Sequence, residues 1–243
     1  FMNRESFNPT LFVPAKGKSD FKTLEGEYVS PVQPGTIRET RDFIKKYDGV
    51  DGFNIYGFER FIYQYIADNY QEDHIEFDMS KINLITIDIE TKAEYGFPDV
   101  ESAAEEILLI TIQDFNTKQI ITWGVGPFVN NQENVDYRQF PDEKAMLNGF
   151  IHWWIDNTPD VVTGWNCEFF DLPYLAGRLA RVLGDKLMKR LSPWGLVTQQ
   201  EVFVMGRKNF CVDVGGVAIL DYMRLYRWSP GTPNQESFRL DYI

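Results

Sequence analysis

Two acidic side chains interrupt an otherwise apolar, β-branched stretch that runs from Ile82 to Thr91. The stretch predicts a buried central strand. Because successive side chains of a strand point to opposite faces, Asp88 and Glu90 share one face, roughly 7 Å apart along the chain. Two like charges drawn to within about 4 Å repel by on the order of 4 kcal/mol at an effective dielectric near 20. A shared divalent cation would relieve that repulsion, and carboxylate oxygens favour Mg²⁺ or Mn²⁺.

The carboxylate pair alone does not exclude a plainer interpretation, a strand end at which both acids simply reach solvent. A second acidic candidate follows the short apolar stretch Val161–Trp165, which predicts another buried strand. Asp171 lies six residues beyond that stretch and precedes Leu172-Pro173, an arrangement typical of a helix N-cap. Alternatively, the strand-to-helix corner projects Asn166 and Asp171 towards the first pair of acids. The two roles are compatible, because a capping carboxylate can bind a metal through its other oxygen.

Alternating strand and helix patterns surround these acids and would position them. The segments after the acidic strand are a hairpin of two strands (Ile107–Phe115 and Gln119–Gly124), a polar loop (Asn130–Asp136), two helices (Asp142–Asp156 and Leu172–Leu183), a second hairpin with a basic tip (Glu201–Val214), a short strand (Val217–Leu220) and a helix (Asp221–Trp228). This order predicts an α/β fold with a mixed sheet of the ribonuclease-H-like kind.

The first 80 residues form a separate region in this interpretation. A strand is expected over Phe7–Val13, and a second helix over Phe58–Tyr70. Thr36 with Glu39 three residues later predicts a capping box at the start of a first helix. Polar and acidic residues then lead into the central strand. We therefore expect a smaller, partial α+β amino-terminal domain over residues 1–80 and a larger domain over residues 81–243.

Composition limits the possible functions. The chain of 243 residues has a net charge of −12, which argues against a free-standing, high-affinity nucleic-acid binder but not against an enzyme whose metal ions bring positive charge. Two histidines exclude a multi-histidine zinc site. Two cysteines without a CxxC motif fit a reducing compartment. No signal peptide and no membrane-spanning apolar stretch are present, so we expect a cytoplasmic protein with no membrane partner.

Several short motifs, in order and at compatible spacing, resemble those of family B DNA polymerases, and replicative polymerases of tailed bacteriophages in particular. Asp88-Ile89-Glu90 and the later Asn166-x-x-x-Phe170-Asp171 are similar to the first two exonuclease motifs of that family. The other matching landmarks are Pro9-x-Leu11-Phe12, Gly96-Phe97-Pro98, Thr163-Gly164-Trp165, Lys189-Arg190-Leu191-Ser192-Pro193, Leu220-Asp221-Tyr222, Leu225-Tyr226 and Leu240-Asp241-Tyr242-Ile243. The resemblance covers nearly the whole chain.

The resemblance implies a proofreading 3′→5′ exonuclease of the DEDD type, which removes nucleotides from the 3′ end of a melted primer. Two Mg²⁺ or Mn²⁺ ions would activate water and stabilise the leaving 3′ oxygen. By the same resemblance, Asp88 contacts both ions, Glu90 binds one, and Asp171 holds the second directly or through water. The location implied is the cytoplasm of a bacterial host.

The DNA contacts implied by the resemblance involve five residues. Phe97 would wedge against unpaired 3′ bases, and Phe170 lies in the second motif. Asn166 would orient the scissile nucleotide. Arg207 and Lys208, in the second hairpin, would lie near the primer–template fork. Four of the five have an alternative: a loop aromatic packed on the domain for Phe97, a hydrogen bond within the corner for Asn166, and a solvated turn for the basic pair.

The sequence departs from the family pattern at one point. The third exonuclease motif, Tyr-x-x-x-Asp on a helix, has no candidate in the right context before Ile243. The polymerase domains of the family have no counterpart either. We therefore expect a fragment, incomplete at its C-terminus, with a half-built metal site that binds divalent ions weakly and does not polymerise DNA.

Three other functions remain open on the sequence. One is a free-standing DEDD exonuclease or ribonuclease, which would need a fourth acid within the chain. The second is a non-catalytic scaffold that binds single-stranded nucleic acid. The third is an acidic interaction domain without a nucleic-acid role.

Overall fold

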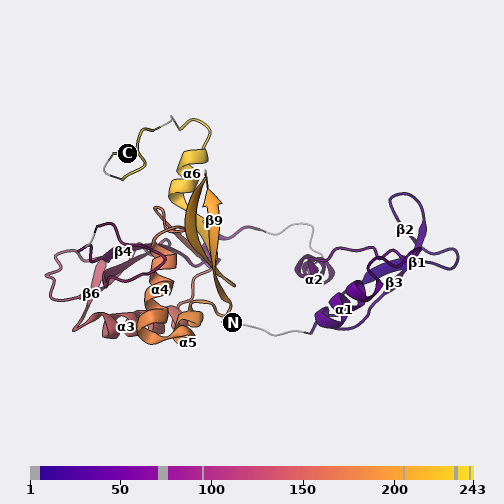
Figure 1. The fold of residues 1–243 in the computed structure, drawn as a ribbon, viewed down its shortest axis with the longest axis horizontal. Coiled ribbons are helices and arrows are strands. Elements are labelled where there is room, and N and C mark those ends of the chain that lie inside the picture. Colours follow the sequence, from indigo (N-terminus) through magenta and orange to yellow (C-terminus); the bar gives the residue numbers. More distant parts are fainter. Residues whose placement is uncertain (1–5, 71–75, 95, 205, 233–234, 241) are drawn as a thin grey trace. The chain divides into compact units, whose positions relative to one another are not determined.

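The computed structural model describes residues 6–70, 76–94, 96–204, 206–232, 235–240 and 242–243, and the chain divides into two compact units, Phe1–Phe77 and Asp78–Ile243 (Figure 1). The predicted α/β fold class, a ribonuclease-H-like mixed sheet with a smaller α+β first region, is confirmed. Among the helices described, none combines the length and the apolar character needed to cross a membrane.

The first unit contains a three-stranded antiparallel sheet and two helices. Its strands, in the spatial order β1-β3-β2, are β1 (Leu11–Pro14), β2 (Phe21–Lys22) and β3 (Tyr28–Val32), and its helices are α1 (Ile37–Tyr47) and α2 (Phe61–Asn69). The predicted capping box is confirmed, because the Thr36 hydroxyl accepts from the Glu39 amide while the Glu39 carboxylate accepts from the Thr36 amide. The predicted strand and second helix both begin later than expected.

The second unit is built on a six-stranded sheet in the order β11-β8-β4-β5-β6-β7. These strands are β4 (Leu84–Thr91), β5 (Ile107–Asp114), β6 (Ile120–Val125), β7 (Val135–Phe140), β8 (Val161–Gly164) and β11 (Ala218–Asp221). β4 lies in the middle, antiparallel to β5 and parallel to β8, so the sheet is mixed. β9 (Val197–Val204) and β10 (Arg207–Val214) form a separate antiparallel hairpin.

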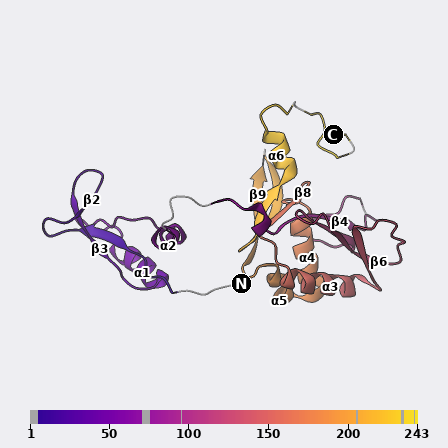
Figure 2. The ribbon, with the colours of Figure 1, turned by 180° about the vertical axis from the view of Figure 1, so that it is seen from behind.

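Helices α3 and α4 cover one face of this sheet (Figures 1 and 2). The helical segments of the unit are η1 (Met79–Lys81), α3 (Glu143–Asp156), α4 (Asp171–Leu183), α5 (Asp185–Met188), η2 (Lys189–Leu191) and α6 (Tyr222–Trp228). Leu147, Phe150 and Ile151 of α3 and Leu175 of α4 are completely buried in the core between helices and sheet. This core fixes α4, and therefore Asp171, relative to the central strand.

The faces of β4 divide as the alternation predicts. Ile85, Ile87 and Ile89 are buried against the helices, whereas Asp88 and Glu90 are exposed on the opposite face. The strand therefore serves as the rigid support of both carboxylates.

Two segments differ from the sequence prediction. The segment predicted as a loop over Asn130–Asp136 ends in β7, an edge strand that pairs in parallel with β6. The second hairpin also has longer strands than predicted, so Arg207 and Lys208 belong to β10 rather than to the turn. Met205, which was predicted in that turn, lies outside the described residues, as do His74 and Asp241.

The core packing gives a stability prediction. Ile151→Ala should reduce the free energy of unfolding of the second unit by about 2–5 kcal/mol, because Ile151 is fully buried and truncation leaves a cavity. All six tryptophans belong to this unit, so urea unfolding followed by tryptophan fluorescence reports on it alone. The exposed control Val129→Ala should change the free energy by less than about 0.5 kcal/mol. Equal effects of the two variants would contradict the assigned core.

Candidate active site

One hydrogen bond joins the two acidic elements. The amide of Ile89, in β4, donates to Oδ1 of Asp171, at the start of α4, over 3.0 Å. β8 pairs with β4 only along Leu84–Thr86, so no strand partner is available for this amide further along β4. A buried amide needs an acceptor, and Asp171 supplies it. The third carboxylate is thereby fixed beside the strand that carries the other two.

The predicted helix-capping role of Asp171 is wrong. Asp171 is the first helical residue, the N-cap position belongs to Phe170, and no side-chain cap is formed there. Oδ1 of Asp171 instead accepts the long-range bond from the Ile89 amide. Capping is a local preference, and here a tertiary contact overrides it.

Gly164 allows the corner to pass close to β4. A Cβ at this position would lie 2.6 Å from the carbonyl oxygen of Ile87 and 2.8 Å from Cβ of Cys167. Only glycine fits this approach without a backbone shift. The turn of the chain after β8 therefore depends on this residue.

Asp221, to which the sequence analysis assigned no functional role, holds the corner from the far side. The carboxylate is buried and accepts from the amides of Asn166 (3.2 Å) and Glu168 (3.0 Å), and it also caps α6 through the amide of Arg224. Asn166 has a positive φ of 64°, a conformation for which asparagine is better suited than most residues. The motif Leu220-Asp221-Tyr222 drew attention to Asp221 in the sequence, but only the fold shows that its carboxylate binds the amides of Asn166 and Glu168.

Two of the three carboxyl groups have a raised pKa. Burial, followed by the charge of Asp88, raises the pKa of Asp171 to about 7, although the Ile89 amide opposes the shift. Burial also raises the pKa of Asp88. Within the described residues, neither Asp88 nor Glu90 forms an ion pair or hydrogen bond that would compensate its charge. The negative charge of Asp88 and Glu90 is therefore available to bind a cation.

Two of the predicted DNA-binding aromatics are brought together. The ring centroids of Phe97 and Phe170 lie 5.1 Å apart, and Phe170 in turn contacts Tyr174 at 5.6 Å. Phe97 is nevertheless 83% exposed. Phe97 therefore presents a supported aromatic face to solvent next to the helix that begins with Asp171.

The other predicted DNA contacts lie elsewhere. Asn166 lines a hollow of about 470 Å³ together with Val204 of the hairpin and residues of α6. Lys208 forms ion pairs with Glu201 (2.9 Å) and Glu101 (3.6 Å). Its positive charge is therefore paired with carboxylates of the protein itself. The side chain of Arg207 lies outside the described part of the structure.

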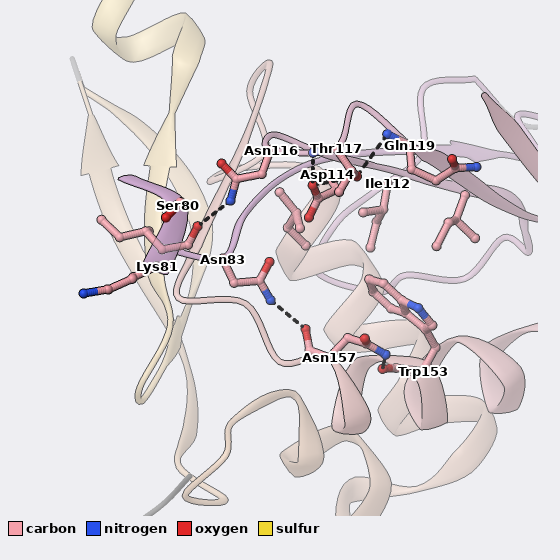
Figure 3. A pocket seen from close by; sticks show the side chains of 13 residues that line it. Ser80, Lys81, Asn83, Ile112, Asp114, Asn116, Thr117, Gln119, Trp153 and Asn157 are labelled. Atoms are coloured by element: carbon pink, nitrogen blue, oxygen red, sulfur yellow. Dashed lines mark hydrogen bonds between the residues drawn. The ribbon is translucent and has the colours of Figure 1, made fainter. Parts of the chain in front are cut away.

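A separate hollow of about 570 Å³ lies at the opposite end of β4 (Figure 3). Its amide side chains are occupied by structural bonds: Asn83 donates to the carbonyl oxygen of Asn157 (3.2 Å) and Asn116 to that of Ile82 (3.2 Å). We assign no binding role to this hollow.

Comparisons with known proteins show the family of the chain. Residues 60–243 match the family model described as DNA polymerase family B, exonuclease domain. The DNA-directed DNA polymerase of Enterobacteria phage T4 is 30% identical over 97% of this chain, and that of Escherichia phage RB69 is 27% identical over 98%. The chain belongs to DNA polymerase family B.

The match to this family B exonuclease domain extends beyond phages. The DNA polymerase catalytic subunit of Alcelaphine herpesvirus 1 is 29% identical over 62% of the chain. The chain spans 28% of the length of the T4 polymerase, 29% of that of RB69 and 15% of the herpesvirus subunit. Residues 60–243, which the family model matches, contain β4 and α4.

The donor set of the family B site fits a divalent metal ion by its chemistry. Hard carboxylate oxygens of Asp88, Glu90 and Asp171 are the ligands that Mg²⁺ and Mn²⁺ prefer. In the described part of the chain, no three or more acidic, histidine or cysteine side chains already stand close enough to hold an ion. Asp88 and Glu90 are exposed and can rotate, so ion binding would have to draw them towards Asp171.

The raised pKa of Asp171 gives a pH-dependent stability prediction. The folded state binds its proton more tightly than the unfolded state, so this stabilisation is complete below about pH 4 and is lost as the pH rises to about 7. In EDTA, Asp171→Asn should therefore gain stability relative to the wild type across that range, by a few kcal/mol above pH 7. Urea unfolding at pH 5 and pH 8 measures the difference.

The exposed Asp156→Asn is the control for removal of a carboxylate. If the advantage of Asp171→Asn were the same at both pH values, the assigned electrostatics of the site would be wrong.

Proposed function

We propose that the second unit is a 3′→5′ exonuclease that hydrolyses the terminal nucleotide of single-stranded DNA, in the proofreading role of a family B polymerase. The observation that supports this most is the bond from the Ile89 amide of β4 to Asp171 of α4, which places the Asp171 carboxylate near enough to Asp88 for their charges to interact. Membership of the family B exonuclease domain supports it independently.

We further propose that Asp88, Glu90 and Asp171 hold two Mg²⁺ or Mn²⁺ ions. Such ions would supply an activated water and stabilise the leaving 3′ oxygen. The protein's own part is positional. β4 fixes two ligands on one face of a rigid strand, and the Ile89 amide fixes the orientation of the third.

The exposed ring of Phe97 offers a stacking surface for the terminal base. Stacking on an aromatic ring contributes about 1–3 kcal/mol per base and tolerates every base, as a proofreading site requires. The contact with Phe170 supports the ring from the protein side. Asn166, Arg207 and Lys208 remain proposed DNA contacts, and Lys208 would have to exchange its carboxylate partners for a phosphate. The remaining domains of a family B polymerase and its primer–template are the partners that this function implies.

The test is hydrolysis of a 5′-labelled single-stranded oligonucleotide in Mn²⁺, with the chain in excess. We expect slow removal of nucleotides from the 3′ end, because only three acidic ligands are described at the site. Asp88→Ala should reduce the rate at least about 100-fold, a loss in the range of several kcal/mol that metal-assisted charge stabilisation provides.

Glu133→Gln is the matched control, since it removes an exposed carboxylate from the loop before β7. Equal rates in wild type and Asp88→Ala would refute the assigned site. Metal-independent DNA binding without hydrolysis would favour the non-catalytic scaffold instead.

A further inference from the structure

The loop that carries Phe97 has a conformation that must be stabilised by other parts of the protein. It connects β4 to β5, and its tip is exposed, yet Ala103 within it is 1% exposed and has a positive φ of 40°. A non-glycine residue keeps such a conformation only where surrounding contacts compensate the strain. The contacts that do so come from one face of α4.

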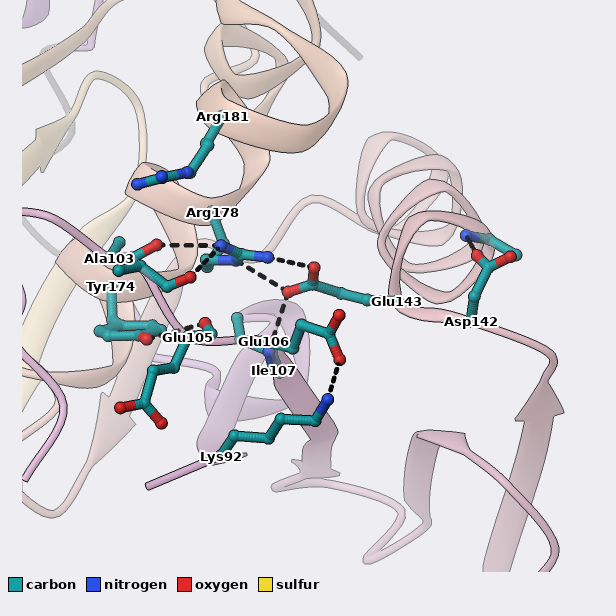
Figure 4. A network of polar contacts seen from close by, with 12 residues as sticks. Lys92, Ala103, Glu105, Glu106, Ile107, Asp142, Glu143, Tyr174, Arg178 and Arg181 are labelled. Carbon is teal, nitrogen blue, oxygen red and sulfur yellow. Dashed lines mark hydrogen bonds and ion pairs between the residues drawn. The ribbon is translucent and has the colours of Figure 1, made fainter. Parts of the chain in front are cut away.

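Three side chains of α4 bind four consecutive carbonyl oxygens of the loop, those of residues 102–105. Figure 4 shows the contacts of Tyr174 and Arg178. The Tyr174 hydroxyl donates to Glu105 (2.8 Å), Arg178 Nη1 to Ala103 (3.1 Å) and Ala104 (2.9 Å), and Arg181 Nη1 to Ser102 (3.0 Å). Positions 174, 178 and 181 follow Asp171 at helical spacing, so all four lie along one face of the helix.

A buried ion pair fixes the orientation of Arg178. Its guanidinium forms a two-pronged pair with Glu143 of α3, and both residues are almost completely buried. Oε1 of Glu143 also accepts from the amide of Ile107, the first residue of β5 (2.8 Å). The planar fork of arginine satisfies the carboxylate and the loop carbonyls together, which a lysine ammonium cannot do with the same geometry.

Gly177 lets the loop approach the helix. A Cβ at this position would lie 2.9 Å from Cβ of Ala103. The position of the loop on α4 is thus determined by close packing as well as by hydrogen bonds.

We propose that this face of α4 is a positioning device for the aromatic step formed by Phe97 and Phe170. The inference rests on the proposed exonuclease function. Tyr174 supports the ring of Phe170 and at the same time holds the loop through its hydroxyl. The helix that fixes Asp171 therefore also fixes the stacking surface, so the terminal base and the carboxylates are kept at a set spacing. Tyr174 and Arg178 are positioning residues and do not touch the DNA.

The test compares two single-stranded oligonucleotides that share a slowly cleaved phosphorothioate as the last linkage. One ends in 2-aminopurine, whose fluorescence is quenched by stacking, and the other ends in an abasic sugar. Tyr174→Phe, Arg178→Lys and Gly177→Ala should each weaken binding of the first about tenfold and reduce its quenching. Binding of the abasic oligonucleotide should change less than about twofold, because no base is present to stack.

Two controls separate positioning from general damage. Arg190 in η2 is exposed, and Arg190→Lys should bind both oligonucleotides as the wild type does. In a Phe97→Ala background, Tyr174→Phe should have no further effect on binding. Hydrogen exchange of the residue 96–106 amides should accelerate in Tyr174→Phe, while far-UV circular dichroism stays unchanged.

The inference is overturned if the variants bind the base-bearing oligonucleotide as the wild type does, or if they weaken both oligonucleotides equally. Its failure is distinguishable from failure of the proposed function. If only the positioning inference fails, Asp88→Ala still reduces hydrolysis strongly. If the proposed function fails, the wild type and Asp88→Ala hydrolyse the oligonucleotide at the same rate.

Discussion

The bond from the Ile89 amide to Asp171 is the contact on which the site depends. It uses a backbone donor that β8 leaves without a strand partner and, in doing so, places a third carboxylate beside Asp88 and Glu90. Burial, and to a lesser extent the charge of Asp88, raises the pKa of Asp171, so ionising this carboxyl group is costly in the folded state. The α3–α4 core nevertheless holds Asp171 in that buried position.

The acidity of the chain has a physical consequence for DNA binding. With a net charge of −12, the chain as a whole repels a polyanion, so affinity for DNA has to come from local features. We propose that metal ions at the carboxylates and an aromatic surface at Phe97 are two such features. Both are controlled by one helix, because α4 begins with Asp171 and binds the loop of Phe97 through Tyr174 and Arg178. In this proposal, local chemistry replaces the basic surface that most DNA-binding proteins use.

Much of the fold and of the site could be predicted from the sequence. Most of the predictions that failed concern contacts between residues far apart in the chain. Alternation along β4 predicted the faces of Asp88 and Glu90, and local periodicity predicted α3 and α4. The cap assigned to Asp171 failed because its partner, Ile89, lies 82 residues away. β7 was missed because an edge strand alternates weakly and its first residues resemble a polar loop. The Glu143–Arg178 pair gave no signal at all, since nothing in either residue's neighbourhood indicates that the other is near.

The central claim is that the three carboxylates share a divalent cation. Calorimetric titration of Mn²⁺ in the presence of a deoxynucleoside monophosphate, on the chain and on Asp88→Ala, tests it most directly. The account predicts saturable binding that disappears in the variant. Equal binding by both proteins would mean that ions associate only with the diffuse acidic surface, and would contradict the assignment of the site.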